Sequence, residues 1–191
     1  TGYDCVVILN NLGDILWNKY LWQFDAYSRT PLGKKRHIKL NKKALPIKDL
    51  RGLPVPTLQQ STHVNSAITL NNSADRYILA TLFHQGEIIL IDREEDTINT
   101  VFEGLYCPHA LREYDDFFLV SNSRGNSILL LDKSKLISEK RLVKIKEVKE
   151  DFNWVQDVVF HQGKYYIADS NNHRIITKNE KFQTIDELHY S

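Results

Sequence analysis

The sequence predicts an all-β fold built from repeated four-stranded antiparallel sheets, and three observations support this prediction. Apolar runs of four to six residues, rich in Ile, Val, Leu, Tyr and Phe, alternate with turns of Gly, Asn, Asp and Ser. Helical periodicity over a dozen residues is not convincing anywhere in the chain. The pattern also recurs about every 46 residues, and repeats of this length with four strands each are typical of β-propeller blades.

The repeat is clearest in the second half of the chain. His109–Leu111 aligns with Gln156–Val158, and Phe117–Ser123 aligns with Lys164–Ser170, both at a spacing of 47 residues. The aligned segments keep a similar order of apolar and polar residues. They therefore predict two copies of one structural unit.

Copies nearer the N-terminus follow with short insertions and deletions. His63 aligns with His109 at a spacing of 46 residues, and Tyr77 aligns with Phe118 at 41. A partial copy opens the chain, because Val6–Asn10 resembles the third strand of the later copies. We therefore expect about three and a half blades.

The predicted organisation has five parts. They are the outer strands of a first blade at 1–24, a basic insertion containing prolines at 25–60, and three blades at 61–106, 107–153 and 154–191. The first blade lacks its two inner strands, residue 1 is Thr, and the chain contains no Met. We therefore expect part of a ring of six or a similar number of blades: a fragment, a nicked protein, or a propeller that another chain completes.

The charge of the chain is unevenly distributed. The net charge is +1, but the segment 29–51 carries +8 and the rest carries −7. Three interpretations of the insertion stay open. It is a lid over the channel mouth, a surface that binds an acidic partner through Lys34, Lys35 and Arg36, or a solvated loop.

Two other classes of partner fit the sequence poorly. Aromatic residues are absent between Arg29 and Arg51, so we expect no nucleic-acid partner despite the positive charge. The longest aliphatic run, Ile88–Ile91, is far shorter than the roughly 20 residues of a membrane-spanning helix. We therefore expect a soluble protein without a membrane partner.

Candidate functional residues lie at the start of the predicted inner strands, which line the channel of a propeller. The alignment places His63, His109 and Gln156 at equivalent positions, and Asn65 follows two residues later on the same strand face. Converging imidazoles could accept a transferred group, carry a proton or bind a metal, although no paired-cysteine metal motif occurs. The alternative is structural, with these side chains bonded to neighbouring backbone or to channel water.

The turns that follow the second strand of each copy favour a structural role. The segments 121–127 and 168–174 are rich in Asn and Ser, with Asp or Gly, as tight hairpins require. We expect His173 and Arg174 to orient neighbouring blades rather than to bind a substrate.

Several motifs resemble those of known propeller families. Tyr166–Ile175, with the sequence YIADSNNHRI, closely resembles the core of the NHL repeat, which is a propeller blade unit. Thr62–Ala67 is similar to the "HINS" strand of arylsulfotransferase-type propellers, and Gly13–Trp17 resembles the G-x-I-x-W outer strand of that family.

The second resemblance implies channel histidines that receive and pass on a sulfuryl group, with His63 and His109 at the family positions. The family's arginine after the second strand is replaced near Leu82 and Phe83. Arg124, one blade further on, is an imperfect substitute. This difference matters because an anionic sulfate needs fixed positive charge during transfer.

The sequence thus predicts a propeller that serves as a scaffold for a small-molecule or protein ligand at the channel mouth. Asn65, Gln156 and Arg124 are the predicted ligand-binding residues of the channel. The alternative is an enzyme in which His63 and His109 are catalytic. That enzyme would be of the arylsulfotransferase-like type or of a metal-dependent NHL type.

Overall fold

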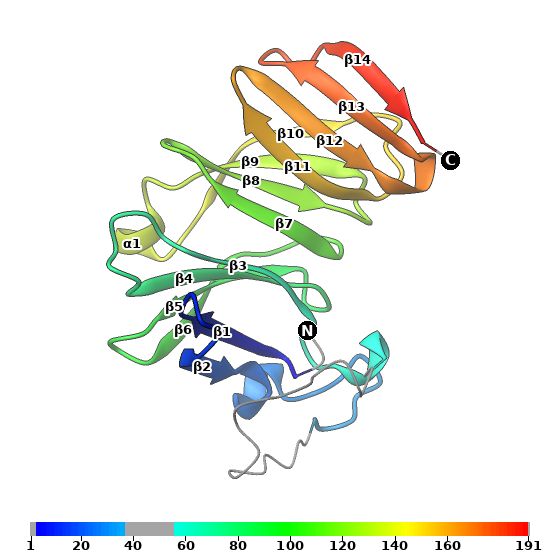
Figure 1. Ribbon diagram of the computed structural model, residues 1–191. Coiled ribbons are helices and arrows are strands. Elements are labelled where there is room, and N and C mark those ends of the chain that lie inside the picture. Colours follow the sequence, from blue (N-terminus) through cyan, green and yellow to red (C-terminus); the bar gives the residue numbers. More distant parts are fainter. Residues whose placement is uncertain (1–2, 37–55, 191) are drawn as a thin grey trace. The chain divides into compact units, whose positions relative to one another are not determined.

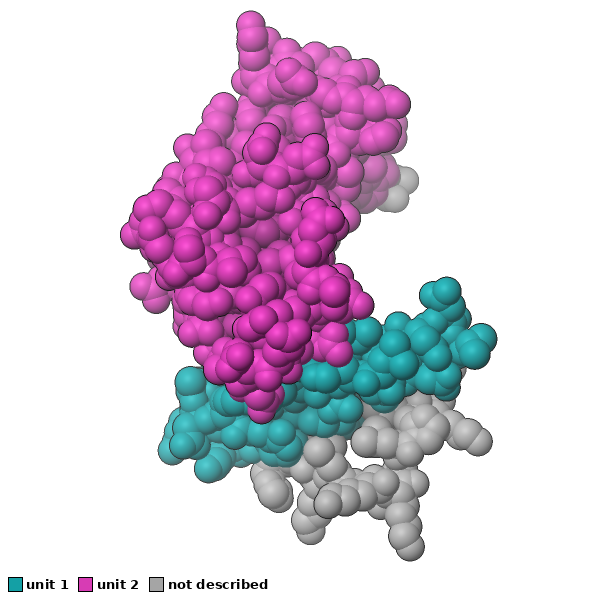
Figure 2. Space-filling model, turned by 90° about the vertical axis from the view of Figure 1, so that its left-hand side faces the viewer, with its two compact units in different colours: residues 1–64 teal, residues 65–191 magenta. Residues whose placement is uncertain are grey.

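The structure is a computed structural model that describes residues 3–36 and 56–190. Strands of five to seven residues alternate with turns, and the only α-helix among the described residues has four residues. The predicted β-propeller fold with four-stranded antiparallel blades is confirmed (Figure 1). The chain forms two compact units, 1–64 and 65–191, which are described separately (Figure 2).

The first unit contains a two-stranded antiparallel sheet. Its strands are β1 (Cys5–Leu9) and β2 (Ile15–Tyr20), and its 3-10 turns are η1 (Leu21–Gln23), η2 (Asp25–Tyr27) and η4 (Thr57–Gln59). The fully buried carboxylate of Asp4 accepts the backbone N–H groups of Ser61, Thr62 and His63 at 2.8, 3.0 and 2.8 Å. It therefore ties the start of the chain to the segment that leads into the next sheet.

Three four-stranded antiparallel sheets follow, and in each of them every strand pairs with the next strand of the chain. The first consists of β3 (Val64–Thr69), β4 (Tyr77–Leu82), β5 (Glu87–Asp92) and β6 (Thr97–Phe102). The second consists of β7 (Pro108–Glu113), β8 (Phe117–Asn122), β9 (Ser127–Asp132) and β10 (Val143–Lys149). The third consists of β11 (Val155–His161), β12 (Lys164–Asp169), β13 (Arg174–Asn179) and β14 (Thr184–His189).

Helical structure in these sheets is limited to connections between strands. The elements are α1 (Leu136–Glu139), between β9 and β10, and η5 (Ser170–Asn172), between β12 and β13. None of the helices in the described parts of the chain is long and apolar enough to cross a membrane.

The first and second blades of the second unit each bury apolar side chains against the blade that follows. In one core cluster, Leu79 and Ile88 of the first sheet pack with Phe118 of the second. In the other cluster, Leu119 of the second sheet packs with Ile167 of the third. All five side chains are fully buried, and each such burial contributes about 1.5–3 kcal/mol.

Strand pairing fixes the register of the repeat. Tyr77 pairs with Asp92, and Phe117 pairs with Asp132, so the first two blades are offset by 40 residues in their second and third strands. The predicted alignment of Tyr77 with Phe118 at a spacing of 41 is therefore wrong by one residue.

The inner strands need a larger correction. A residue with a left-handed backbone precedes each of them: His63 with φ 49°, Cys107 with φ 52° and Trp154 with φ 68°. Cys107 and Trp154 are separated by the predicted 47 residues, but His63 and Cys107 are separated by 44. The predicted spacing of 46 is thus wrong, and Asn65, not His63, is the equivalent of His109.

Candidate functional site

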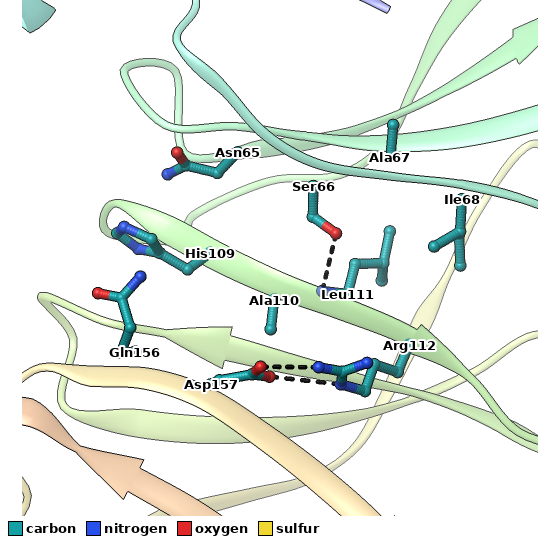
Figure 3. A pocket seen from close by; sticks show the side chains of 10 residues that line it. All are labelled: Asn65, Ser66, Ala67, Ile68, His109, Ala110, Leu111, Arg112, Gln156 and Asp157. Carbon is teal, nitrogen blue, oxygen red and sulfur yellow. Dashed lines mark hydrogen bonds and ion pairs between the residues drawn. The ribbon is translucent and has the colours of Figure 1, made fainter. Parts of the chain in front are cut away.

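A cavity of about 420 Å³ lies between the inner strands β3, β7 and β11 in the second unit (Figure 3). Its lining residues are Asn65, Ser66, Ala67, Ile68, His109, Ala110, Leu111, Arg112, Gln156 and Asp157. Small-molecule pockets commonly measure about 300–1,000 Å³. The cavity is therefore large enough for a small ligand.

Three polar side chains at one position of the repeat gather at one end of this cavity. Asn65, His109 and Gln156 each lie two residues after the left-handed residue that precedes their inner strand. The common backbone geometry turns the three side chains toward the same space, as Figure 3 shows. Of the four side chains predicted to converge, Asn65, His109 and Gln156 thus line one cavity, and His63 does not.

The imidazole of His109 is held through one of its two nitrogens. Nδ1 lies 3.0 Å from the carbonyl oxygen of Cys107 and 2.8 Å from Oγ of Ser123. Burial lowers the pKa of His109, because the charged ring loses water, and the hydrogen bond to the Cys107 carbonyl partly opposes this shift. The ring is therefore poised to be neutral near pH 7.

Aromatic rings surround His109. The ring centroids of Phe83 and Trp154 lie 5.5 and 5.6 Å from that of His109, both in edge-to-face arrangements. The indole Nε1–H of Trp154 donates a hydrogen bond to Oε1 of Gln156 at 3.0 Å. This bond fixes the amide of Gln156 and directs its N–H groups elsewhere.

The positive charge in the lining is compensated. Nε and Nη2 of Arg112 donate to the two carboxylate oxygens of Asp157 at 3.3 and 2.7 Å, and Nε also donates to the carbonyl of Val158 at 3.1 Å. Because the guanidinium and the carboxylate form a two-point ion pair, the cavity lining carries no net charge from them.

Asn65 also makes a structural contact. Its Nδ2 donates to the carbonyl oxygen of Pro108 at 3.1 Å, and thereby links β3 to β7. Such a bond to neighbouring backbone is what the structural alternative predicts for these positions. The side-chain oxygen of Asn65 makes no hydrogen bond within the described parts of the chain, and it remains available as an acceptor.

Two of the predicted channel residues do not line the cavity. His63 belongs to the first unit, where its Nδ1 lies 2.7 Å from Oε1 of Gln60. Arg124 is exposed and lies beside the thiol of Cys107, where its charge partly opposes the increase of the thiol pKa caused by burial. Within residues 3–36 and 56–190, no three His, Cys, Asp or Glu side chains are grouped as a metal ion would require.

The predicted basic surface is described only in part, because 37–55 lies outside the described residues. Lys34 and Lys35 are exposed. Arg36 has a structural environment instead: its Nε lies 3.3 Å from Oδ2 of the buried Asp4, and its Nη1 donates to the carbonyl of Gln59 at 2.7 Å.

Arg174 serves to hold the last blade together. It contacts the buried carboxylate of Asp169 at 2.8 Å, Glu187 at 3.2 Å and Asp151 at 3.1 Å. Asp151 lies in the loop that arrives from the previous blade. The guanidinium therefore joins its own sheet to that loop.

The sequence interpretation missed several residues around the cavity. Arg112 and Asp157 had a usable signal, because each is a charged residue within three positions of a predicted channel residue on the same inner strand. Phe83, Ser123 and Trp154 come from turns and loops of three different blades, and no sequence spacing predicts their meeting at His109.

Comparisons with known proteins support the fold. No family model matches the chain, and no curated protein matches its sequence. The periplasmic gluconolactonase PpgL of Pseudomonas aeruginosa is similar over 72% of this chain and 41% of its own, with 15% identity and a TM-score of 0.52. A Bacteroides fragilis protein described as a candidate 6-phosphogluconolactonase is similar over 69% of this chain and 40% of its own, with 8% identity and a TM-score of 0.53. The chain thus spans about two fifths of the length of each structure.

Proposed function

We propose that this chain supplies a propeller scaffold whose cavity binds a small polar molecule around His109. The observation that carries the proposal is the convergence of Asn65, His109 and Gln156, from three blades, on one cavity of about 420 Å³. Rigid strands hold all three side chains, and pre-formed sites of this kind bind ligands with little reorganisation. The resemblance of the last blade to the NHL repeat supports a scaffold role.

The test is a titration of 15N-labelled protein with a library of small polar molecules, followed by calorimetry on each compound that binds. We expect resonance shifts confined to the cavity lining, and at least a tenfold loss of affinity in His109→Ala. The control is His161→Ala, an exposed histidine on β11 that does not line the cavity. Equal affinity in His109→Ala, or shifts that avoid the cavity, contradicts the proposal.

A second candidate is an enzyme of the arylsulfotransferase-like type, with His109 as the acceptor of a sulfuryl group. The position of its imidazole in the cavity favours this candidate. The pairing of Arg112 with Asp157 argues against it, because sulfuryl transfer needs positive charge that is free to stabilise an anion.

Turnover of p-nitrophenyl sulfate distinguishes the two candidates. Hydrolysis or transfer by the wild type that is lost in His109→Ala or His63→Ala supports the enzyme, and no turnover by the wild type rejects it. Metal analysis of the purified protein, followed by chelation, tests the metal-dependent NHL-type alternative in the same way.

We also propose that the basic insertion binds an acidic partner, with Lys34 and Lys35 among its contacts. Both side chains are exposed, whereas Arg36 lies against Asp4 and is better regarded as structural. Binding of polyglutamate to the wild type is expected to weaken at high salt, and to weaken in Lys34→Glu/Lys35→Glu. Polyglutamate binding that is insensitive to both changes contradicts this role.

A further inference from the structure

We propose that Ser123 is a positioning residue that keeps the proton of His109 on Nδ1, so that Nε2 faces the cavity as a permanent hydrogen-bond acceptor. This arrangement selects ligands that offer a hydroxyl or another hydrogen-bond donor. The part of the proposal that concerns ligands rests on the proposed function of the cavity. The part that concerns the imidazole does not.

The hydroxyl of Ser123 determines the direction of its bond to His109. A serine hydroxyl has one hydrogen to donate. The carbonyl oxygen of Val155 lies 2.6 Å from Oγ, and a carbonyl can only accept, so it takes this hydrogen. Oγ must therefore act as the acceptor in its 2.8 Å contact with Nδ1 of His109.

The second partner of Nδ1 leads to the same conclusion. The carbonyl oxygen of Cys107, 3.0 Å away, can also only accept a hydrogen bond. Two acceptors thus share the Nδ1–H group. In the neutral ring the lone pair then lies on Nε2, because the partner of one ring nitrogen sets the state of the other.

The repeat supports a specific role for Ser123. The strand offsets of 40 and 47 residues make Phe83 and Ser170 its equivalents in the neighbouring blades. The inner strands of those blades carry Asn65 and Gln156 where the middle blade carries His109. Amide side chains have no ring tautomer to control. Among these three described blades, a buried serine contacts an imidazole of the inner strand only in the middle one.

The other polar groups of the cavity agree with a neutral, hydroxyl-bearing ligand. Nδ2 of Asn65 is occupied by the Pro108 carbonyl, so Asn65 offers an oxygen acceptor among the residues that line the cavity. Oε1 of Gln156 is occupied by the Trp154 indole, so Gln156 offers N–H donors. One hydroxyl group can donate to one of these two acceptors and accept from Gln156, and a second hydroxyl of the same ligand can donate to the other acceptor.

The experiment measures the His109 tautomer in the ligand-free protein. Long-range 1H–15N correlation spectra of 15N-histidine-labelled protein at pH 8 are expected to show a protonated Nδ1 and a bare Nε2. Ser123→Ala is expected to raise the ratio of the opposite tautomer about fivefold, because one of two acceptors is lost. Ser123→Thr keeps the hydroxyl and is expected to restore the wild-type ratio.

Ser121→Ala is the matched control, because Ser121 is also fully buried and its Oγ makes no hydrogen bond within the described parts of the chain. It is expected to leave the ratio unchanged. A wild-type ring with the proton on Nε2, or a Ser123→Ala ratio equal to that of the wild type, overturns the proposal. The wild-type spectrum decides the first point even if Ser123→Ala does not fold.

The ligand class is tested separately with erythritol, inositol and glucose against inorganic sulfate. We expect a polyol to shift the Nε2 resonance while Nδ1 stays protonated, and we expect sulfate to leave both resonances unchanged. Binding of sulfate with protonation of Nε2, or no response to any polyol, overturns the ligand class. Either result leaves the tautomer measurement intact, so the two failures are distinguishable.

Discussion

Because the ring of His109 is half-buried, its protonation affects the stability of the fold. Burial lowers the pKa of His109 in the folded protein below its value in the unfolded chain. As the pH falls, the unfolded chain therefore binds the proton first, and the folded state loses stability below the ordinary histidine pKa of about 6.5. Above that pH both states are neutral at this residue, and the effect is absent.

This sign gives a testable pH dependence. The free energy of unfolding, measured in urea at pH 7.5 and 5.5, is expected to decrease less in His109→Gln than in the wild type, because the variant cannot take up this proton. His161→Gln, which changes an exposed histidine, is expected to keep the greater part of the wild-type decrease. An identical decrease in His109→Gln and the wild type contradicts this account.

Arg174 shows how a single charged residue holds a blade. Removal of its guanidinium in Arg174→Ala leaves the fully buried carboxylate of Asp169 without its cationic partner. Breaking a buried ion pair in this way is expected to lower the free energy of unfolding by about 3 kcal/mol. Arg141→Ala, at an exposed position, is expected to change it by less than about 0.5 kcal/mol in the same urea titration. Similar losses in the two variants contradict this role.

At the scale of the elements, Gly86 controls the hairpin between β4 and β5. Its φ is 68°, and an added Cβ atom would collide with the carbonyl oxygen of Leu105. The same glycine accepts the N–H of Leu105 through its own carbonyl at 2.9 Å, so the two segments cannot move apart without losing this bond. Glycine is therefore required here by both backbone conformation and space.

We expect Gly86→Ala to lower the free energy of unfolding by about 2 kcal/mol or more, the sum of backbone strain and collision. Gly104→Ala is the matched control, since Gly104 has a φ of 83° but nothing within 4 Å of the added atom. Its loss is expected to be about 1 kcal/mol from backbone strain alone. Equal losses in the two variants, measured by urea unfolding, contradict this account, because they mean that the folded protein relieves the collision.

The repeated elements also show what the sequence could predict. Apolar runs and turn residues determine local conformation, so their alternation predicted the strands and the four-stranded blades. The register of the first inner strand could not be predicted from this local pattern. The chain runs from Leu70 to Arg76 between β3 and β4 but only from Tyr114 to Asp116 between β7 and β8, so matching two histidines by letter placed the insertion wrongly.

That error placed the candidate residue of the first inner strand two positions too early, but on the correct face of the strand. A shift of two residues keeps a side chain on the same side of a strand but displaces it by about 7 Å along the strand. His63 was thus assigned the place that Asn65 occupies. The aromatic neighbours of His109 were beyond prediction, because Phe83 and Trp154 reach it from the turns of other blades through three-dimensional packing alone.

At the scale of the whole molecule, two positions of the repeat each occur in two environments. The offset of 47 residues makes Tyr166 the equivalent of Leu119, and Ile175 the equivalent of Ile128. Leu119 and Ile128 are fully buried against the third blade, whereas Tyr166 and Ile175 are 38% and 39% exposed. We propose that a further blade covers this face, as the third blade covers Leu119 and Ile128.

The two environments predict losses of stability of different size when a side chain is truncated to alanine. At low protein concentration Leu119→Ala is expected to lower the free energy of unfolding by about 2–5 kcal/mol, because it leaves a cavity between two blades. Tyr166→Ala is expected to lower it by less than about 1 kcal/mol, because little packing is lost. If another copy of the chain supplies the covering blade, the effect of Tyr166→Ala grows with protein concentration, and sedimentation of the wild type shows association that the variant weakens. A large effect of Tyr166→Ala at every concentration contradicts the exposure of this face in the single chain.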